Sequence, residues 1–195
     1  MKIGTIVAVA IVVILGIWGI SSYNGLVSSE QGVDAQWAQV ENVYQRRADL
    51  VPNLVETVKG AANFEKETYT AVAEARSQAG KVTIGKDVLN DPAAFQKFQA
   101  AQDSLSSALS RLLVVAEKYP DLKATQAFRD LQAQLEGTEN RIAVERQRFN
   151  EVAQQFNSKR SSFPTVILAN LFSKFAEKPY FHAQAGAETA PKVKF

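Results

Sequence analysis

The chain has 195 residues, with 22 Lys and Arg against 20 Asp and Glu, no cysteine and a single histidine. This composition excludes disulfides, thiolate metal sites and cysteine nucleophiles, and its near-neutral charge balance is unlike that of a nucleic-acid binder. One histidine also excludes a di-iron helical bundle, which needs a Glu-x-x-His pair on each of two helices. We therefore predict no metal, no cofactor and no nucleic-acid partner.

The first part of the chain is a long apolar run. From Ile3 to Ile20 the sequence IGTIVAVAIVVILGIWGI carries no charge. As a helix it spans roughly 27 Å, close to the ~30 Å hydrocarbon core of a bilayer. A cleaved signal peptide is the alternative, but its apolar region is normally about 7–15 residues long. We predict an uncleaved transmembrane anchor over residues 1–22.

The charges that flank this run indicate its orientation. Lys2 precedes the run, and no Lys or Arg follows it before Arg46. Positive charge close to a span is retained on the cytoplasmic side. We therefore expect a cytoplasmic N-terminus and an extracytoplasmic remainder, with the lipid bilayer as the first partner of the chain.

A helical pattern follows over about residues 28–79. Its apolar residues alternate steps of four and three, which places them on one face: Val33, Trp37, Val40, Tyr44, Val51, Leu54, Val58 and Ala61. Pro52 interrupts this stripe, because proline removes a helical hydrogen bond. Either one long helix kinks there or a second helix starts there. The register continues through Pro52, which favours a kink.

Two further long helices and one short helix are predicted downstream. Residues 80–91 have loop composition, and Asp91 with Pro92 forms a cap for a helix over 92–118. A third long helix covers about 125–161. The apolar run 166–172 is too short to span a membrane; it caps the helical body, lies in the membrane interface or meets another subunit. Residues 183–195 are predicted to be a flexible tail.

The densest polar cluster surrounds Pro52. Helical spacing pairs Arg46 with Asp49 and Asn53 with Glu56. Arg47 falls on the apolar stripe, where its guanidinium requires carboxylate or carbonyl partners, and Glu139 or Glu145 is a suitable candidate. We interpret this cluster as a structural polar clasp, with a ligand or partner site as the alternative, formed by Arg46, Arg47, Asp49, Asn53 and Glu56.

The predicted helix lengths leave one apolar stripe without a partner. A helix over residues 28–79 is about 75 Å long, whereas the returning helix over 92–118 is about 40 Å long. The stretch next to the membrane then lacks cover, and an exposed apolar stripe normally marks an interface. We expect neighbouring copies to cover it, through Val33, Trp37, Val40 and Tyr44. A sharp break at Pro52, which would fold the stripe into its own chain, is the alternative.

No catalytic pattern is found in the sequence. There is no Gly-x-Ser-x-Gly elbow, phosphate-binding glycine loop or His-Glu-x-x-His run. A Ser-His-Asp triad would depend on His182, in a segment that looks peripheral. We predict that the chain is not an enzyme.

Several distinctive runs occur along the chain. The longest follows Trp37 and covers residues 45–60, QRRADLVPNLVETVKG. Others are Glu74-Ala75-Arg76, Glu117-x-Tyr119-Pro120-Asp121-Leu122-Lys123-Ala124, Leu135-Glu136-Gly137-Thr138-Glu139-Asn140-Arg141-Ile142-Ala143, Pro179-Tyr180-Phe181 and Pro191-x-Val193-x-Phe195. Together these runs, which extend over nearly the whole chain, resemble the LemA family of bacterial membrane proteins.

The resemblance implies a membrane-anchored, antiparallel up-and-down helical bundle in the bacterial inner membrane, with no agreed biochemical activity. The expected fold is all-α: the anchor over residues 1–22 continues into a long kinked helix, the LemA-like bundle covers 23–162, a short apolar helix and turn cover 163–182, and the tail covers 183–195. A relative associated with magnetosomes is linked to membrane organelle formation.

Two functions follow from these expectations. The first is a non-enzymatic scaffold that self-associates on the extracytoplasmic face and organises the membrane or cell envelope. The second is an adaptor for another membrane protein, such as a peptidase or transporter. The adaptor binds through its short apolar helix or through the C-terminal residues Val193 and Phe195, because an apolar residue with a free carboxylate suits capture by peptide-binding domains.

Overall fold

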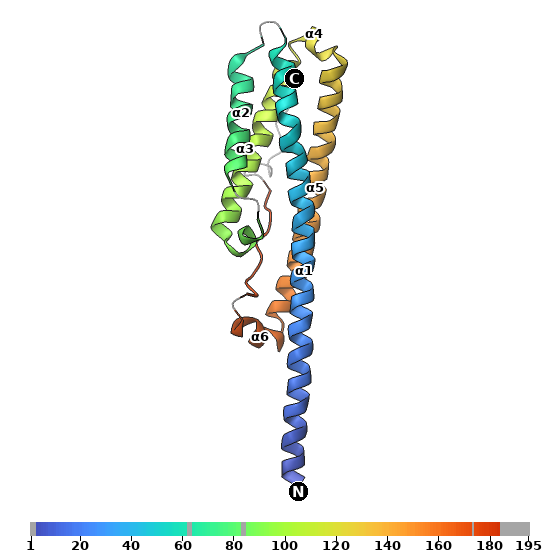
Figure 1. Ribbon diagram of the computed structural model, residues 1–195, viewed down its shortest axis with the longest axis vertical. Coiled ribbons are helices and arrows are strands. Elements are labelled where there is room, and N and C mark those ends of the chain that lie inside the picture. Colours follow the sequence, from blue (N-terminus) through green and yellow to red (C-terminus); the bar gives the residue numbers. More distant parts are fainter. Residues whose placement is uncertain (1–2, 62–63, 83–84, 173, 184–195) are drawn as a thin grey trace, which may run out of the picture.

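The structure, a computed structural model, describes residues 3–61, 64–82, 85–172 and 174–183. Every regular element in these ranges is helical, which confirms the all-α prediction (Figure 1). The elements are α1 (Ile3–Lys59), α2 (Lys66–Lys81), the 3₁₀ helix η1 (Lys86–Asn90), α3 (Pro92–Ala116), α4 (Pro120–Lys123), α5 (Gln126–Ser161) and α6 (Thr165–Leu171).

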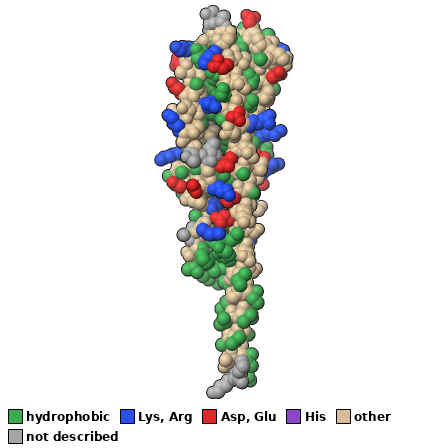
Figure 2. Space-filling view, in the orientation of Figure 1, with side chains coloured by type: hydrophobic (Ala, Val, Ile, Leu, Met, Phe, Trp, Pro, Cys, Tyr) green, Lys and Arg blue, Asp and Glu red, His purple; other side chains and the backbone are tan. Residues whose placement is uncertain are grey.

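The helix α1 runs the length of the molecule (Figure 1). It has 57 residues, or about 85 Å at 1.5 Å per residue. Its N-terminal part projects beyond the other helices, and apolar side chains cover the visible face of this projection (Figure 2). It contains the one described segment that is long and apolar enough to cross a membrane, with a mean hydropathy of 2.7 and no buried residue.

The remaining helices pack along the other part of α1 and form the helical body. Three contacts show that α5 returns along α1: Lys159 Nζ lies 2.7 Å from the carbonyl of Gly25, Gln36 Nε2 lies 2.6 Å from Glu145, and Arg47 Nη1 lies 2.9 Å from Glu139. The pair α2 and α3 packs beside α1 toward the end where α4 lies (Figure 1). We call this end the far end, and the end where α1 leaves the body the anchor end.

The body contains two apolar cores along its axis. The anchor-end core surrounds Trp37, whose ring is 5.4 Å from those of Phe98 and Phe149. The far-end core surrounds Leu54 and Leu112. Both cores use the same face of α1, so the predicted stripe is the buried seam of the whole body.

The capping residues explain where two of the predicted helices begin. The carboxylate of Asp91 accepts hydrogen bonds from the amides of Ala93 and Ala94, at 2.9 and 3.1 Å, ahead of α3. The hydroxyl of Thr125 accepts from the amide of Phe128 ahead of α5. Such caps satisfy amides that have no partner within the helix, and the starts predicted at Pro92 and near Thr125 are confirmed.

The favoured continuation of the first helix through Pro52 is confirmed, but its predicted end near residue 79 is wrong. The helix α1 continues through Pro52 to Lys59, and α2 begins only at Lys66. Gly60 directly follows the last helical residue, as is common at helix C-termini. The stretch predicted as one kinked helix over 28–79 is therefore two helices, and the body has four longer helices where three were expected.

The predicted exposure of the α1 stripe is also wrong. Val33, Trp37 and Val40 have no exposed surface, and Tyr44 is 2% exposed. Because α1 reverses near Gly60 and α5 extends back to the anchor end, the stripe is covered by residues of its own chain, including Phe98 of α3 and Phe149 of α5. The expectation that these four residues contact neighbouring copies is thereby overturned.

Arg76 explains how α1 tolerates Pro52. Proline has no amide hydrogen, so the carbonyl four residues earlier, that of Ala48, loses its helical donor. Arg76 of α2 supplies the missing hydrogen bond: its Nε lies 2.9 Å from the Ala48 oxygen. The pair replaces a bond within α1 with a bond between α1 and α2.

We predict that Pro52→Ala and Arg76→Ala are coupled. In the wild-type chain, Arg76→Ala leaves the Ala48 carbonyl without a donor and lowers the free energy of unfolding by about 1 kcal/mol. In the Pro52→Ala background the new amide reaches the same carbonyl, and the loss shrinks. Thermal unfolding of the four full-length variants in detergent, followed by circular dichroism, measures the coupling. Equal losses in both backgrounds would contradict this account.

Candidate functional site

A buried polar layer separates the two apolar cores. Arg47 lies on the α1 stripe between Tyr44 of the first core and Val51 of the second, and its side chain is fully buried. Two polar residues of other helices are also buried: Gln102 of α3, which contacts Arg47, is 3% exposed, and Thr138 of α5 is 2% exposed. The layer therefore draws on three helices.

The guanidinium of Arg47 is the centre of this layer. Its Nη1 donates to Glu139 Oε1 at 2.9 Å and to the hydroxyl of Ser106 at 2.6 Å. Its Nη2 donates to the side-chain and backbone oxygens of Gln102. Glu139 and Glu145 were the two predicted partners of Arg47. Glu139 binds its guanidinium, whereas Glu145 accepts a hydrogen bond from Gln36. Charged hydrogen bonds on the two terminal nitrogens offset much of the cost of removing the guanidinium from water, while the buried Nε has no hydrogen-bond partner among the described residues.

The other members of the predicted clasp lie on the outside of α1. Arg46, Asp49, Asn53 and Glu56 are exposed. Asp49 accepts from Gln45 at 2.8 Å, and Glu56 pairs with Lys59 at 2.7 Å. The clasp is thus formed by Arg47 with residues of α3 and α5, and the remaining cluster is a solvated helix face.

A second cation joins the helices on the anchor side of this layer. Arg146 of α5 donates to the hydroxyl of Tyr44 at 2.6 Å and to Asp103 at 2.8 Å. Burial raises the pKa of the Tyr44 hydroxyl, and the adjacent Arg146 guanidinium opposes this shift. The group links α1, α3 and α5 a second time.

An extended segment over residues 174–183, the C-terminal strap, completes the anchor-end core. Asn157 and Asn150, two turns apart on α5, each bind the strap backbone twice. Asn157 contacts the carbonyl and amide of Lys178, and Asn150 those of Phe181, all at 2.9 Å. These amide side chains satisfy backbone groups of a segment that forms no regular secondary structure, as burial requires.

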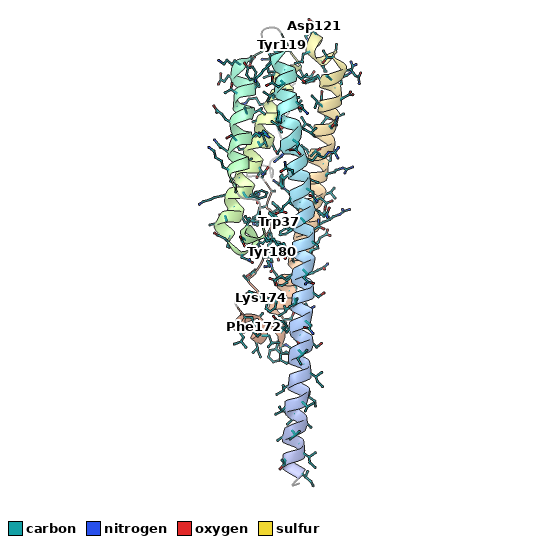
Figure 3. All side chains as sticks on the ribbon, in the orientation of Figure 1. Trp37, Tyr119, Asp121, Phe172, Lys174 and Tyr180 are labelled. Atoms are coloured by element: carbon teal, nitrogen blue, oxygen red, sulfur yellow. The ribbon has the colours of Figure 1, made fainter. Side chains whose placement is uncertain are left out.

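The strap inserts its own side chains between the helices. Phe175 has no exposed surface and Phe181 is 6% exposed; the ring of Phe181 lies 4.8 Å from that of Phe95. Lys178 is 3% exposed, and its ammonium lies 2.8 Å from Asn90 and 3.3 Å from Glu30. Trp37 and Tyr180 are labelled at this level in Figure 3.

The C-terminal strap was not predicted from the sequence. The short region 163–182 was expected to be a helix and turn, and α6 covers only Thr165–Leu171 of it. One feature of the sequence could have indicated it: Asn150 and Asn157 recur two turns apart, next to the apolar residues of α5, where amide side chains need hydrogen-bond partners. The candidate partner-binding residues Val193 and Phe195 lie outside the described residues.

The described residues hold no recognisable catalytic constellation. No group of three or more His, Cys, Asp or Glu in these ranges is arranged to bind a metal ion. The backbone of His182 is bound by Gln99, with its carbonyl 2.8 Å from Gln99 Nε2. His182 borders a shallow cavity of about 600 Å³ between α5 and the strap, whose other lining residues include Arg146, Asn150 and Tyr180. The polar groups Arg146 and Asn150 are engaged in holding the body together.

These features define a helical protein with one exposed apolar span and a body held in register by buried polar groups. The chain belongs to the LemA family, whose sequence pattern matches residues 36–195. It is 27% identical over 184 residues to the magnetosome protein MamQ of Magnetospirillum gryphiswaldense, covering 86% of this chain and 67% of that protein. It is 25% identical over 146 residues to protein LemA of Metamycoplasma hominis, covering 75% of this chain and 63% of that protein.

We predict that Arg47→Ala strongly destabilises the body. The substitution leaves the buried side chain of Gln102 without its donor, and a buried group left unpaired in this way costs about 1–3 kcal/mol. Glu139 is 38% exposed and can bind water instead, while the space left by the guanidinium adds a cavity to this cost. Arg46→Ala is the matched control, because Arg46 is the exposed neighbour on the same helix and should change stability by about 0.5 kcal/mol or less. Denaturant unfolding of the full-length chain in detergent measures both. Equal effects of the two substitutions would refute the structural role of Arg47.

Proposed function

We propose that this chain is a non-enzymatic scaffold anchored in the bacterial inner membrane, whose body is an antiparallel helical bundle held at a fixed geometry to the bilayer. The carrying observation is the continuity of α1. The same helix provides the exposed apolar run Ile3–Ile20 and the buried seam of the body from Leu26 to Val58. A simple tether needs no rigid connection, whereas a scaffold requires one.

The family and its relatives support this proposal. The LemA match covers most of the body and continues to residue 195. The similarity to proteins named for the magnetosome is in keeping with a role in building a cellular structure. The polar groups of the body, such as Arg47, Arg146 and Asn150, are used for internal contacts, which fits a structural role better than a catalytic one.

The proposed orientation places the body outside the cytoplasm. It depends on Lys2 before the span and on the absence of Lys and Arg between the span and Arg46. Because the natural chain has no cysteine, one introduced thiol reports its own side of the membrane.

We predict that Ser110→Cys and Ser158→Cys react with a membrane-impermeant maleimide in intact spheroplasts. Both serines are exposed, on α3 and α5, so the substitutions should leave the body folded. Labelling is expected before and after permeabilisation to equal extents. Labelling that requires permeabilisation at both positions would place the body in the cytoplasm and reverse the proposed orientation.

Self-association of the scaffold is proposed to occur through the span, since the α1 stripe is used inside the chain. The span presents Gly4, Gly16 and Gly19, and a Cβ added at any of them meets no atom within 4 Å. Small residues of this kind allow helix backbones to approach closely in membranes. Because these positions have no neighbour in their own chain, larger side chains there can disturb only contacts with other molecules.

We predict that the detergent-extracted protein has the mass of several chains, each of 21.4 kDa, and that Gly16→Leu with Gly19→Leu lowers this mass. Gly137→Leu is the control, since Gly137 lies on α5 in the body and also has open space around it. Native mass spectrometry measures all three proteins. A wild-type protein with the mass of one chain would contradict self-association, and a complex containing a different membrane protein would favour the adaptor function.

A further inference from the structure

The helix α6 exposes an apolar surface at the anchor end of the body. Ile167 and Leu171 are four residues apart on α6, so they lie on one side of the helix, and they are 58% and 72% exposed. Phe163, in the turn before α6, is 83% exposed. Phe172 adds to the same region and is 40% exposed. We call these four residues the α6 patch. Figure 2 shows apolar side chains gathered at this end of the body, beside the point where α1 leaves it.

The opposite side of α6 fixes the helix to the body. Ala169 is 2% exposed and belongs to the anchor-end core. Phe172 and Phe175 place their rings 5.3 and 5.5 Å from that of Tyr23 on α1. The exposure of the patch is therefore a property of a docked helix with one buried side.

The contact with Tyr23 sets the height of the patch relative to the span. Tyr23 is three residues beyond Ile20, the last residue of the apolar run, a rise of about 4.5 Å. The polar interfacial layer of a bilayer is about 5–8 Å thick on each side. If the run Ile3–Ile20 fills the hydrocarbon core, the C-terminal end of α6 lies within that layer.

Two lysines lie near the patch, at the level of α1 just beyond the span. Lys174 Nζ lies 4.9 Å from the ring centre of Phe175 and 5.5 Å from that of Tyr23. Its side chain is 48% exposed, and its ammonium lies 3.9 Å from the carboxylate of Glu30. Lys159 lies on the other side, bound to the carbonyl of Gly25. An apolar surface with bordering lysines and a tyrosine is the arrangement that favours a lipid interface, with apolar groups toward the acyl chains and ammonium groups at the phosphates.

We propose that the α6 patch is a second membrane contact, which rests in the outer interfacial layer beside the span. Leu171 and Ile167 then contact lipid, while Lys174 and Lys159 lie at the headgroup level. The inference rests on the proposed anchoring of the chain and adds a contact that the span alone does not provide. The α6 patch lies directly beside the end of the span, and this position favours lipid over a second copy of the chain as the molecule that covers it.

Spin labels at three equally exposed apolar positions test the proposal. Leu171→Cys lies in the patch, Val12→Cys lies in the span and Val114→Cys lies toward the far end on α3; the natural residues are 72%, 68% and 67% exposed. The labelled full-length proteins are placed in nanodiscs of equal parts phosphatidylcholine and phosphatidylglycerol. Collision with oxygen, which enters lipid, is then compared with collision with a water-soluble nickel chelate.

The expected result is an oxygen-to-nickel ratio at Leu171→Cys that is clearly above that at Val114→Cys and below that at Val12→Cys, with Ile167→Cys in agreement. A ratio at position 171 equal to that at 114, with position 12 rich in oxygen, would overturn the second contact and leave the anchor intact. Protection of position 171 from both reagents would mean that protein covers the patch, and would overturn it as well. A nickel-accessible position 12 would reject the anchor itself.

Discussion

The structure depends on the placement of one buried guanidinium. Arg47 lies between two apolar cores and binds Gln102 and Ser106 of α3 and Glu139 of α5. Apolar seams tolerate sliding of one helix along another, because leucine and valine contacts are similar at successive turns. A buried charge tolerates no such shift, because a displacement by one turn separates it from its partners. We therefore regard the polar layer as the element that fixes the register of α1, α3 and α5.

Periodicity and local chemistry predicted much of this fold. The steps of four and three from Val33 to Val58 identified the buried face of α1, and Asp91 with Pro92 identified the start of α3. The position of Arg47 within that apolar face identified a group that needs buried partners, and Glu139 was one of two carboxylates named. These features depend on residues close together in the sequence or on one helix face, where spacing determines geometry.

Other features depend on contacts that spacing does not determine. The register predicted that the helix continues through Pro52, but spacing could not show that Arg76, on another helix, donates to the Ala48 carbonyl that Pro52 leaves without a donor. Nor could it show that α1 ends at Lys59. Because the chain turns near Gly60 and not near residue 80, α2 packs beside α1 and α3 follows it. The comparison of predicted helix lengths also left out α5, which extends back to the anchor end and covers Trp37 within the chain. The C-terminal strap was missed because an extended segment held by Asn150 and Asn157 has no periodic pattern of its own.

Because α1 is continuous, a tilt of the span also tilts the body. Transmembrane helices tilt by about 20° on average, in response to bilayer thickness among other factors. The part of α1 beyond the span is about 58 Å long, so a tilt of that size displaces the far end sideways by about 20 Å. A small change in the tilt of the anchor therefore produces a large sideways displacement of α4 and the rest of the far end. A contact between α6 and the membrane surface would limit this movement in one direction and give the tilt a preferred azimuth.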